Sequence, residues 1–84
     1  MRFSVYIKKS AEKELSSLSS ATHDKIVKHL VELEQNPLPK GVKKLRGMDA
    51  YRLRVGDYRI LYQIHSKKKI IEVIAIAHRK DAYR

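Results

Sequence analysis

The sequence contains no cysteine, and this absence excludes two kinds of chemistry. The chain can form no disulfide bond, and it has no thiolate that could attack a substrate or bind a metal ion. Long apolar runs are also missing. None approaches the length of a membrane span, and residues 1–15 lack the apolar segment of a signal peptide. We therefore expect a cytoplasmic protein with no membrane association.

Several familiar sites for phosphate and metal ions are absent as well. The three glycines do not form the glycine-rich loop that cradles nucleotide phosphates. His23 and His29 are six positions apart, which is the wrong spacing for a shared metal site on one helix. Asp49, Asp57 and Asp81 are scattered among predicted turns and do not suggest a two-metal nuclease site. We expect no cofactor and no metal ion.

What the sequence has in excess is positive charge. It contains 19 Lys and Arg against 9 Asp and Glu, which gives a formal net charge of +10. Residues 1–36 carry six basic against five acidic side chains, whereas residues 37–84 carry thirteen against four. This asymmetry predicts a polyanionic partner for the C-terminal half, with nucleic acid the leading candidate. An acidic protein would also satisfy it. A membrane surface is less suitable, because the basic residues lie on predicted strands and not on an amphipathic helix.

The first part of the chain predicts a strand and a helix pair within one domain, residues 1–84. Residues 3–8 alternate between apolar and polar, which is typical of a strand. A short helix with Ser10 as its N-cap follows, and a serine-rich turn ends it. The apolar stripe of this helix consists of Ala11, Leu15 and Leu18.

A longer second helix is predicted from about Ala21, with Ser20 as its N-cap. It ends at Asn36–Pro37, because proline cannot continue the hydrogen-bond ladder and disfavours helical geometry in the residue before it. The residues expected to form its buried face are Ile26, Val27, Leu30, Val31 and Leu33.

The rest of the chain predicts an antiparallel β-meander. A basic connection over residues 38–47 contains a short strand near Val42, and Gly56–Asp57 is suited to a tight hairpin turn. The three main strands are expected at Tyr51–Val55, Tyr58–His65 and Ile70–Ala77. The last strand is apolar on both faces, so we place it in the interior of the sheet. The predicted fold class is α+β, with both helices packed on one face of the sheet.

Alternation within the strands suggests a basic site. Arg52 and Arg54 occupy every second position of their strand and point away from its apolar face. Arg59 lies in the row opposite Tyr58 and Ile60 on the next strand, and we expect it to share the uncovered face. Arginines on a rigid sheet are well suited to gripping phosphates. They could also serve only to protect an exposed sheet face, and periodicity alone leaves both interpretations open.

Further basic and aromatic residues favour phosphate binding. Arginine combined with accessible aromatic rings is typical of proteins that hold phosphates and stack unpaired bases. The residues expected to contact RNA are Lys43, Lys44, Arg46, Tyr51, His78 and Lys80. A structural role would account for His78 equally well. Lys67, Lys68 and Lys69 lie in a predicted turn, and we interpret them as solvated surface residues.

Three segments in order, LRGM, YRLRVGDYRILYQI and AHRKDAY, closely resemble the RelE branch of the RelE/ParE toxin superfamily. The resemblance implies a small toxin that cleaves messenger RNA on the translating ribosome and is neutralised by a tightly bound, acidic, RelB-like antitoxin. It also implies the catalytic positions. The basic strand residues of the family fall on Arg52 and Arg54, the next strand arginine on Arg59, the arginine after the last strand on Arg79, and the terminal tyrosine on Tyr83.

One departure from the family bears on mechanism. Some relatives have lysine where this chain has Arg52 and Arg54, and a guanidinium is a poor general base at neutral pH. The general base is therefore left open. RNA brings its own nucleophile, the 2′-hydroxyl, so a metal-independent cleavage is expected. Two alternatives remain at this point: a DNA gyrase inhibitor of the ParE kind, and a non-catalytic module that binds RNA or the ribosome.

Overall fold

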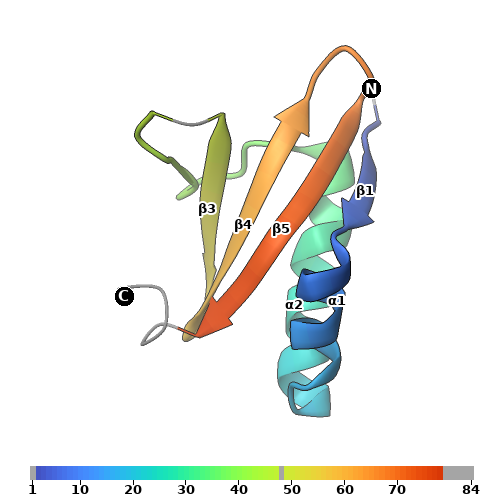
Figure 1. The fold of residues 1–84 in the computed structure, drawn as a ribbon, viewed down its shortest axis with the longest axis vertical. Helices are drawn as coiled ribbons and strands as arrows, with labels where there is room; N and C mark the ends of the chain where they lie inside the picture. Colours follow the sequence, from blue (N-terminus) through green and yellow to red (C-terminus); the bar gives the residue numbers. More distant parts are fainter. Residues whose placement is uncertain (1, 48, 79–84) are drawn as a thin grey trace.

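The computed structural model describes residues 2–47 and 49–78. Within them a single sheet of five strands has the order β1-β5-β4-β3-β2, and two helices pack against one of its faces (Figure 1). The elements are β1 (Ser4–Ile7), α1 (Lys9–Ser16), α2 (Ser20–Gln35), β2 (Lys43–Lys44), β3 (Ala50–Val55), β4 (Tyr58–His65) and β5 (Ile70–His78). Helix α1 packs against β5, and α2 packs against β1 and β3. The predicted α+β class is confirmed.

Strands β3, β4 and β5 form the expected antiparallel meander. Gly56 in the first turn has a φ of 59°, a conformation that glycine adopts without steric cost. Strand β5 is interior, as its apolar faces predict, because β1 covers its other edge. That pairing is parallel, with Val5 beside Ile71, and the sequence analysis did not predict it. No local turn joins β1 to β5, so the local sequence does not fix their relative direction.

Both predicted helix caps are displaced. Helix α1 begins at Lys9, and its N-cap residue Lys8 makes no side-chain hydrogen bond, so Ser10 lies inside the helix. Helix α2 begins one residue before the expected start. The Ser19 hydroxyl oxygen accepts a hydrogen bond from the Thr22 N–H at 3.4 Å, and Ser20 is the first helical residue. A run of serines offers several equivalent caps, and only the path of the chain selects one.

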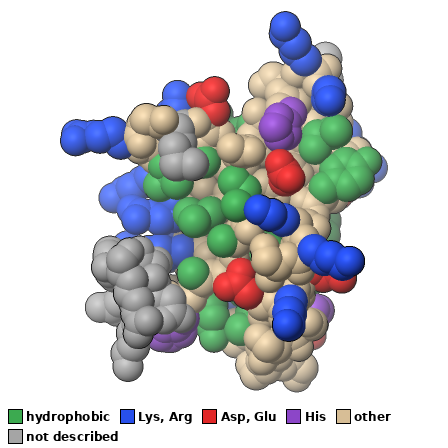
Figure 2. Space-filling model, viewed as in Figure 1, with side chains coloured by type: hydrophobic (Ala, Val, Ile, Leu, Met, Phe, Trp, Pro, Cys, Tyr) green, Lys and Arg blue, Asp and Glu red, His purple; other side chains and the backbone are tan. Residues whose placement is uncertain are grey.

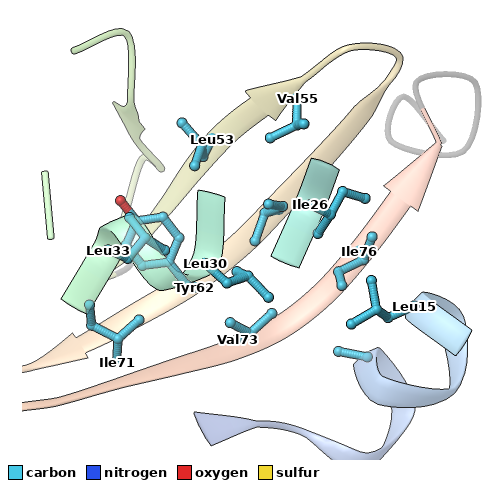
Figure 3. Close-up of a cluster of buried hydrophobic side chains, with 12 residues drawn as sticks. Leu15, Ile26, Leu30, Leu33, Leu53, Val55, Tyr62, Ile71, Val73 and Ile76 are labelled. Atoms are coloured by element: carbon cyan, nitrogen blue, oxygen red, sulfur yellow. The ribbon is translucent and has the colours of Figure 1, made fainter. Parts of the chain in front are cut away.

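The core lies between the helices and the sheet (Figure 3). Its buried side chains are Ala11, Leu15, Ile26, Leu30, Leu33, Leu53, Val55, Ile60, Tyr62, Ile71, Val73 and Ile76. Val27 packs against this cluster, but Val31 is 54% exposed and its predicted burial is wrong. The buried stripe of α2 follows Ile26, Leu30 and Leu33, which leaves Val31 on the outer side of the helix.

A β-bulge interrupts the pairing of β4 with β5. Leu61 pairs with Ala75, whereas the next residue, Tyr62, pairs with Val73. Ile74 is therefore an extra residue on β5. The bulge inverts the alternation of the strand beyond it, since a one-residue shift exchanges the two faces of a sheet.

The bulge therefore decides which side chains in the second half of β5 face the core. Ile76 is buried in the core, Ala77 pairs with Arg59 and His78 pairs with Tyr58. The N–H of Ile76 donates to the Glu14 carboxylate of α1 at 3.3 Å. Strand β1 pairs with β5 only as far as Val73, so the α1 carboxylate binds a main-chain donor beyond the end of β1.

Candidate nucleic-acid interface

Four basic side chains come together on the face of the sheet that the helices do not cover, which we call the open face. Lys43 on β2 lies directly opposite Arg52 on β3, and Arg54 on β3 lies directly opposite Arg59 on β4. Directly paired residues of antiparallel strands project to the same side of a sheet, with their Cβ atoms about 4.5–5.5 Å apart. Three adjacent strands therefore hold one basic cluster. The prediction that Arg52, Arg54 and Arg59 share a face agrees with this register.

The members of this cluster differ in exposure. Lys43 and Arg54 are exposed, Arg52 is half-buried and Arg59 is only 2% exposed. Arg59 pairs on its other side with Ala77 of β5. Arginine keeps its positive charge in proteins. The cluster therefore combines a fixed inner charge at Arg59 with reachable donors at its rim.

An apolar strip borders the basic cluster. Leu61 on β4 lies opposite Arg52 on one side and Ala75 on the other, and all three positions belong to the open face. Figure 2 shows Lys and Arg side chains gathered beside β3, with apolar side chains next to them toward the middle of the molecule. A surface with phosphate-binding groups beside an apolar strip can receive both the backbone and the bases of a single strand.

Three of the residues expected to contact RNA lie elsewhere. Tyr51 belongs to the helix-covered side, where its ring packs on Tyr62 with 5.8 Å between ring centroids. Lys44 pairs with Tyr51 in the register, so it projects to that same side, and its ammonium lies 3.7 Å from Asp49. His78 is turned away from the open face by the bulge, and its ring meets that of Tyr58 edge-on at 5.1 Å.

The other residues predicted for the site are Arg46 and three residues near the C-terminus. Arg46 is exposed in the turn after β2. Arg79, Lys80 and Tyr83 lie outside the described residues. Among residues 2–47 and 49–78, no three His, Asp or Glu side chains come together in a way that could hold a metal ion. The described helices include none that is long and apolar enough to cross a membrane.

One basic residue near the cluster escaped the sequence-based prediction. Lys40 follows Pro39 in the loop after α2, and it lines a hollow together with Lys43 and two arginines of β3. The sequence signal that could have found it is the closely spaced Lys40, Gly41 and Lys43, which place two cations around a flexible residue.

Tyr62 ties the loop after α2 to the sheet. Its hydroxyl donates a hydrogen bond of 2.7 Å to the Pro37 carbonyl oxygen. Burial, together with the neighbouring Tyr51, raises the pKa of Tyr62 to about 12. The phenol therefore stays protonated and keeps donating across the physiological pH range. This bond fixes the start of the segment that carries Lys40 and Lys43.

Comparison with known proteins agrees with this architecture. Residues 5–83 match the family model described as ParE toxin of type II toxin-antitoxin system, parDE. The mRNA interferase toxin RelE of Escherichia coli is 37% identical over 73 residues, covering 83% of this chain and 76% of that protein.

Solved structures give the same relationship. RelE in the archaeal RelE–RelB complex of Pyrococcus horikoshii has a TM-score of 0.86 and 35% identity, covering 94% of this chain and 97% of that one. The intact E. coli RelBE toxin–antitoxin complex gives a TM-score of 0.79 and 31% identity, covering 93% of this chain and 96% of that one. The match extends over nearly the whole chain in sequence and in fold, and the protein belongs to the RelE/ParE family of toxins of type II toxin–antitoxin systems.

Proposed function

We propose that this toxin is an endoribonuclease that cuts messenger RNA on the translating ribosome and thereby blocks translation. The observation that carries the proposal is the register of the open face, where Arg54 lies directly opposite Arg59 and Lys43 directly opposite Arg52. The relative from E. coli that is named an mRNA interferase supports the reaction class. Because it acts on translating ribosomes, this activity belongs to the cytoplasm.

The reaction uses the nucleophile of the RNA. The 2′-hydroxyl oxygen forms a bond to the adjacent phosphorus, the bond to the 5′-oxygen of the next nucleotide breaks, and a 2′,3′-cyclic phosphate results. A base takes the 2′-hydroxyl proton, and an acid returns a proton to the leaving oxygen. The charge that develops on the phosphoryl oxygens is neutralised by the arginines at the family positions, Arg52, Arg54, Arg59 and Arg79. Tyr83 stacks on a base or assists proton transfer.

The chemistry of the open face supports a requirement for the ribosome. The basic cluster lies on the surface of a sheet, and the described residues supply cations to it but no carboxylate. Cations stabilise charge, but they do not by themselves align a 2′-hydroxyl with its phosphorus. The ribosome holds the message in a defined geometry. Free RNA is therefore expected to be a poor substrate.

The test is to map message ends after the purified protein is added to a translating extract. Primer extension should give new ends within codons that are being translated, also when chelating agents are added to preformed ribosome complexes. Intact messages on arrested ribosomes would leave only the non-catalytic binding module. Inhibition of DNA supercoiling with no translation arrest would instead identify a gyrase inhibitor.

A separate antitoxin is the second part of the proposal. The relatives from P. horikoshii and E. coli were solved in complexes with RelB. For this chain we expect an acidic antitoxin, partly disordered when free, whose capture is accelerated by the net charge of +10. Expression of the toxin alone should arrest growth, and co-expression of the antitoxin should restore it. Harmless expression of the isolated toxin at high level would contradict the proposal.

A further inference from the structure

A hollow of about 280 Å³ lies at the outer edge of the sheet, between the loop after α2 and strand β3. Strand β2 pairs with β3 only through Lys43 and Lys44, which lie opposite Arg52 and Tyr51. Beyond the Lys43–Arg52 pair the chain leaves the edge of β3, and the hollow occupies the gap. Its lining residues are Lys40, Gly41, Lys43, Arg52, Leu53 and Arg54.

The lining of this hollow is basic, and the described residues supply no counter-charge to it. Four of its six residues are Lys or Arg, and no acidic side chain of the described residues lines it. None of the four cations forms an ion pair with any group in the described part of the chain. Elsewhere Lys44, the immediate neighbour of Lys43, does have a carboxylate partner in Asp49. Like charges held together without a counter-charge destabilise a fold, so the arrangement favours binding of an anion.

The position of Lys40 is fixed by backbone geometry. The Val42 N–H donates to the Pro39 carbonyl oxygen at 3.2 Å, which closes a four-residue turn with Lys40 and Gly41 at its centre. Gly41 has a φ of 91°, as the third residue of a type II turn requires, and an added Cβ there would meet no atom within 4 Å. Glycine is therefore needed at this position for the turn conformation and not for close packing.

We propose that this hollow binds a second phosphate of the RNA backbone, one that is not cut, through Lys40 and Lys43, with Arg52 and Arg54 shared with the cleavage site. The inference rests on the proposed function for the identity of the anion. The hollow is smaller than the roughly 300–1,000 Å³ of pockets that enclose whole ligands. It therefore suits a phosphate with part of its ribose, while the base remains outside. Two phosphate positions set the direction in which a strand crosses the open face.

The test measures binding without cleavage. A fluorescein-labelled 2′-O-methyl RNA hexanucleotide cannot be cut, and its affinity is measured by fluorescence anisotropy over a series of KCl concentrations. Each phosphate contact on a single strand contributes about 0.7 to the slope of log Kobs against log salt. Lys40→Gln should reduce that slope by about this amount and weaken binding several-fold at low salt. The matched control is Lys67→Gln, which removes one exposed lysine from the β4–β5 turn and should change affinity less than twofold.

The outcomes distinguish an RNA phosphate site from bulk attraction and from a protein contact. Equal effects of Lys40→Gln and Lys67→Gln would show that only bulk charge matters and would overturn the proposal. If Lys40→Gln left RNA affinity unchanged but weakened binding of the acidic antitoxin, the hollow would be a protein contact and the proposal would be wrong. Binding of the Lys40→Gln variant to ribosomes without message is measured in parallel. A defect in hexanucleotide binding identifies messenger RNA as the source of the phosphate, and a defect in ribosome binding identifies ribosomal RNA. Either defect supports a phosphate site. A toxin that binds the hexanucleotide through Lys40 yet never cuts messages would contradict the proposed function alone.

Discussion

Arg54 and Arg59 lie directly opposite each other on strands β3 and β4. Like charges in such a cross-strand pair destabilise a sheet by about 0.2–1 kcal/mol. The next pair outward on the open face, Lys43 with Arg52, repeats the arrangement. A sheet selected only for stability would place an acidic or neutral residue at one position of each pair. The two pairs are what the proposed phosphate-binding role requires, and cross-strand stability alone would not favour them.

Replacing Arg54 should consequently separate stability from activity. In Arg54→Gln the repulsion from Arg59 is relieved, so the free energy of unfolding should rise by about 0.2–1 kcal/mol. Cleavage in a translating extract should fall by about 100-fold or more, because a donor to the developing phosphoryl charge is lost. Urea denaturation and primer extension measure the two effects. Loss of both stability and cleavage would mean that Arg54 has a structural role.

Arg79 is the family position that the sequence places directly after β5. Arg79→Ala is expected to raise the activation free energy of cleavage by about 2–4 kcal/mol and so to slow the reaction. This is the usual cost of removing a contact made mainly in the transition state. The circular dichroism spectrum should not change. Lys68→Ala removes one lysine from the β4–β5 turn and serves as the control. Equal losses from the two substitutions would indicate that no organised site exists.

The Tyr62 hydroxyl should make stability depend on alkaline pH. Its pKa is about 12 in the folded protein and 10.0 in its unperturbed state. Between these values the unfolded chain releases the phenol proton while the folded chain retains it, so the free energy of unfolding falls as pH rises. Two pKa units set an upper bound of about 2–3 kcal/mol. This contribution is complete below pH 10.

Tyr62→Phe provides the comparison for that measurement. It should cost about 1 kcal/mol near neutral pH, because the hydrogen bond to the Pro37 carbonyl oxygen is lost. Its stability should then decline less steeply than that of the wild type between pH 10 and 12. Parallel curves for the two proteins would show that Tyr62 does not control the alkaline decline.

The cap of α2 offers a test of the fold itself. Ser19→Ala removes the hydroxyl that accepts the Thr22 N–H and should destabilise the protein by about 0.5–2 kcal/mol. Ser10→Ala is the matched control, since Ser10 is exposed within α1 and caps nothing; its effect should stay within about 0.5 kcal/mol. Thermal unfolding of both variants measures the difference. A larger loss for Ser10→Ala would contradict the observed cap.

The local sequence was sufficient to predict features that depend on near neighbours in the chain. Alternation of apolar and polar residues placed β3 and β4 and put Arg52, Arg54 and Arg59 on one face, because side chains of a strand alternate strictly between its two sides. Pro37 marked the end of α2 correctly, since proline has no N–H to continue the helical hydrogen bonds and disfavours helical geometry in the residue before it. The meander followed from short polar turns, which permit only antiparallel neighbours.

Tertiary structure decided the features that depend on distant partners. The bulge at Ile74 is set by the fit of β5 against β4 and the core, and it turns His78 away from the open face. The parallel β1–β5 pair joins segments that no local turn connects. Lys40 reaches the basic cluster only because the loop after α2 leaves the edge of β3 at Lys43. The sequence alone determined which residues carry the charge and which face of each strand they occupy. Three-dimensional packing determined which of those charged side chains meet, because contacts between distant segments depend on the whole fold.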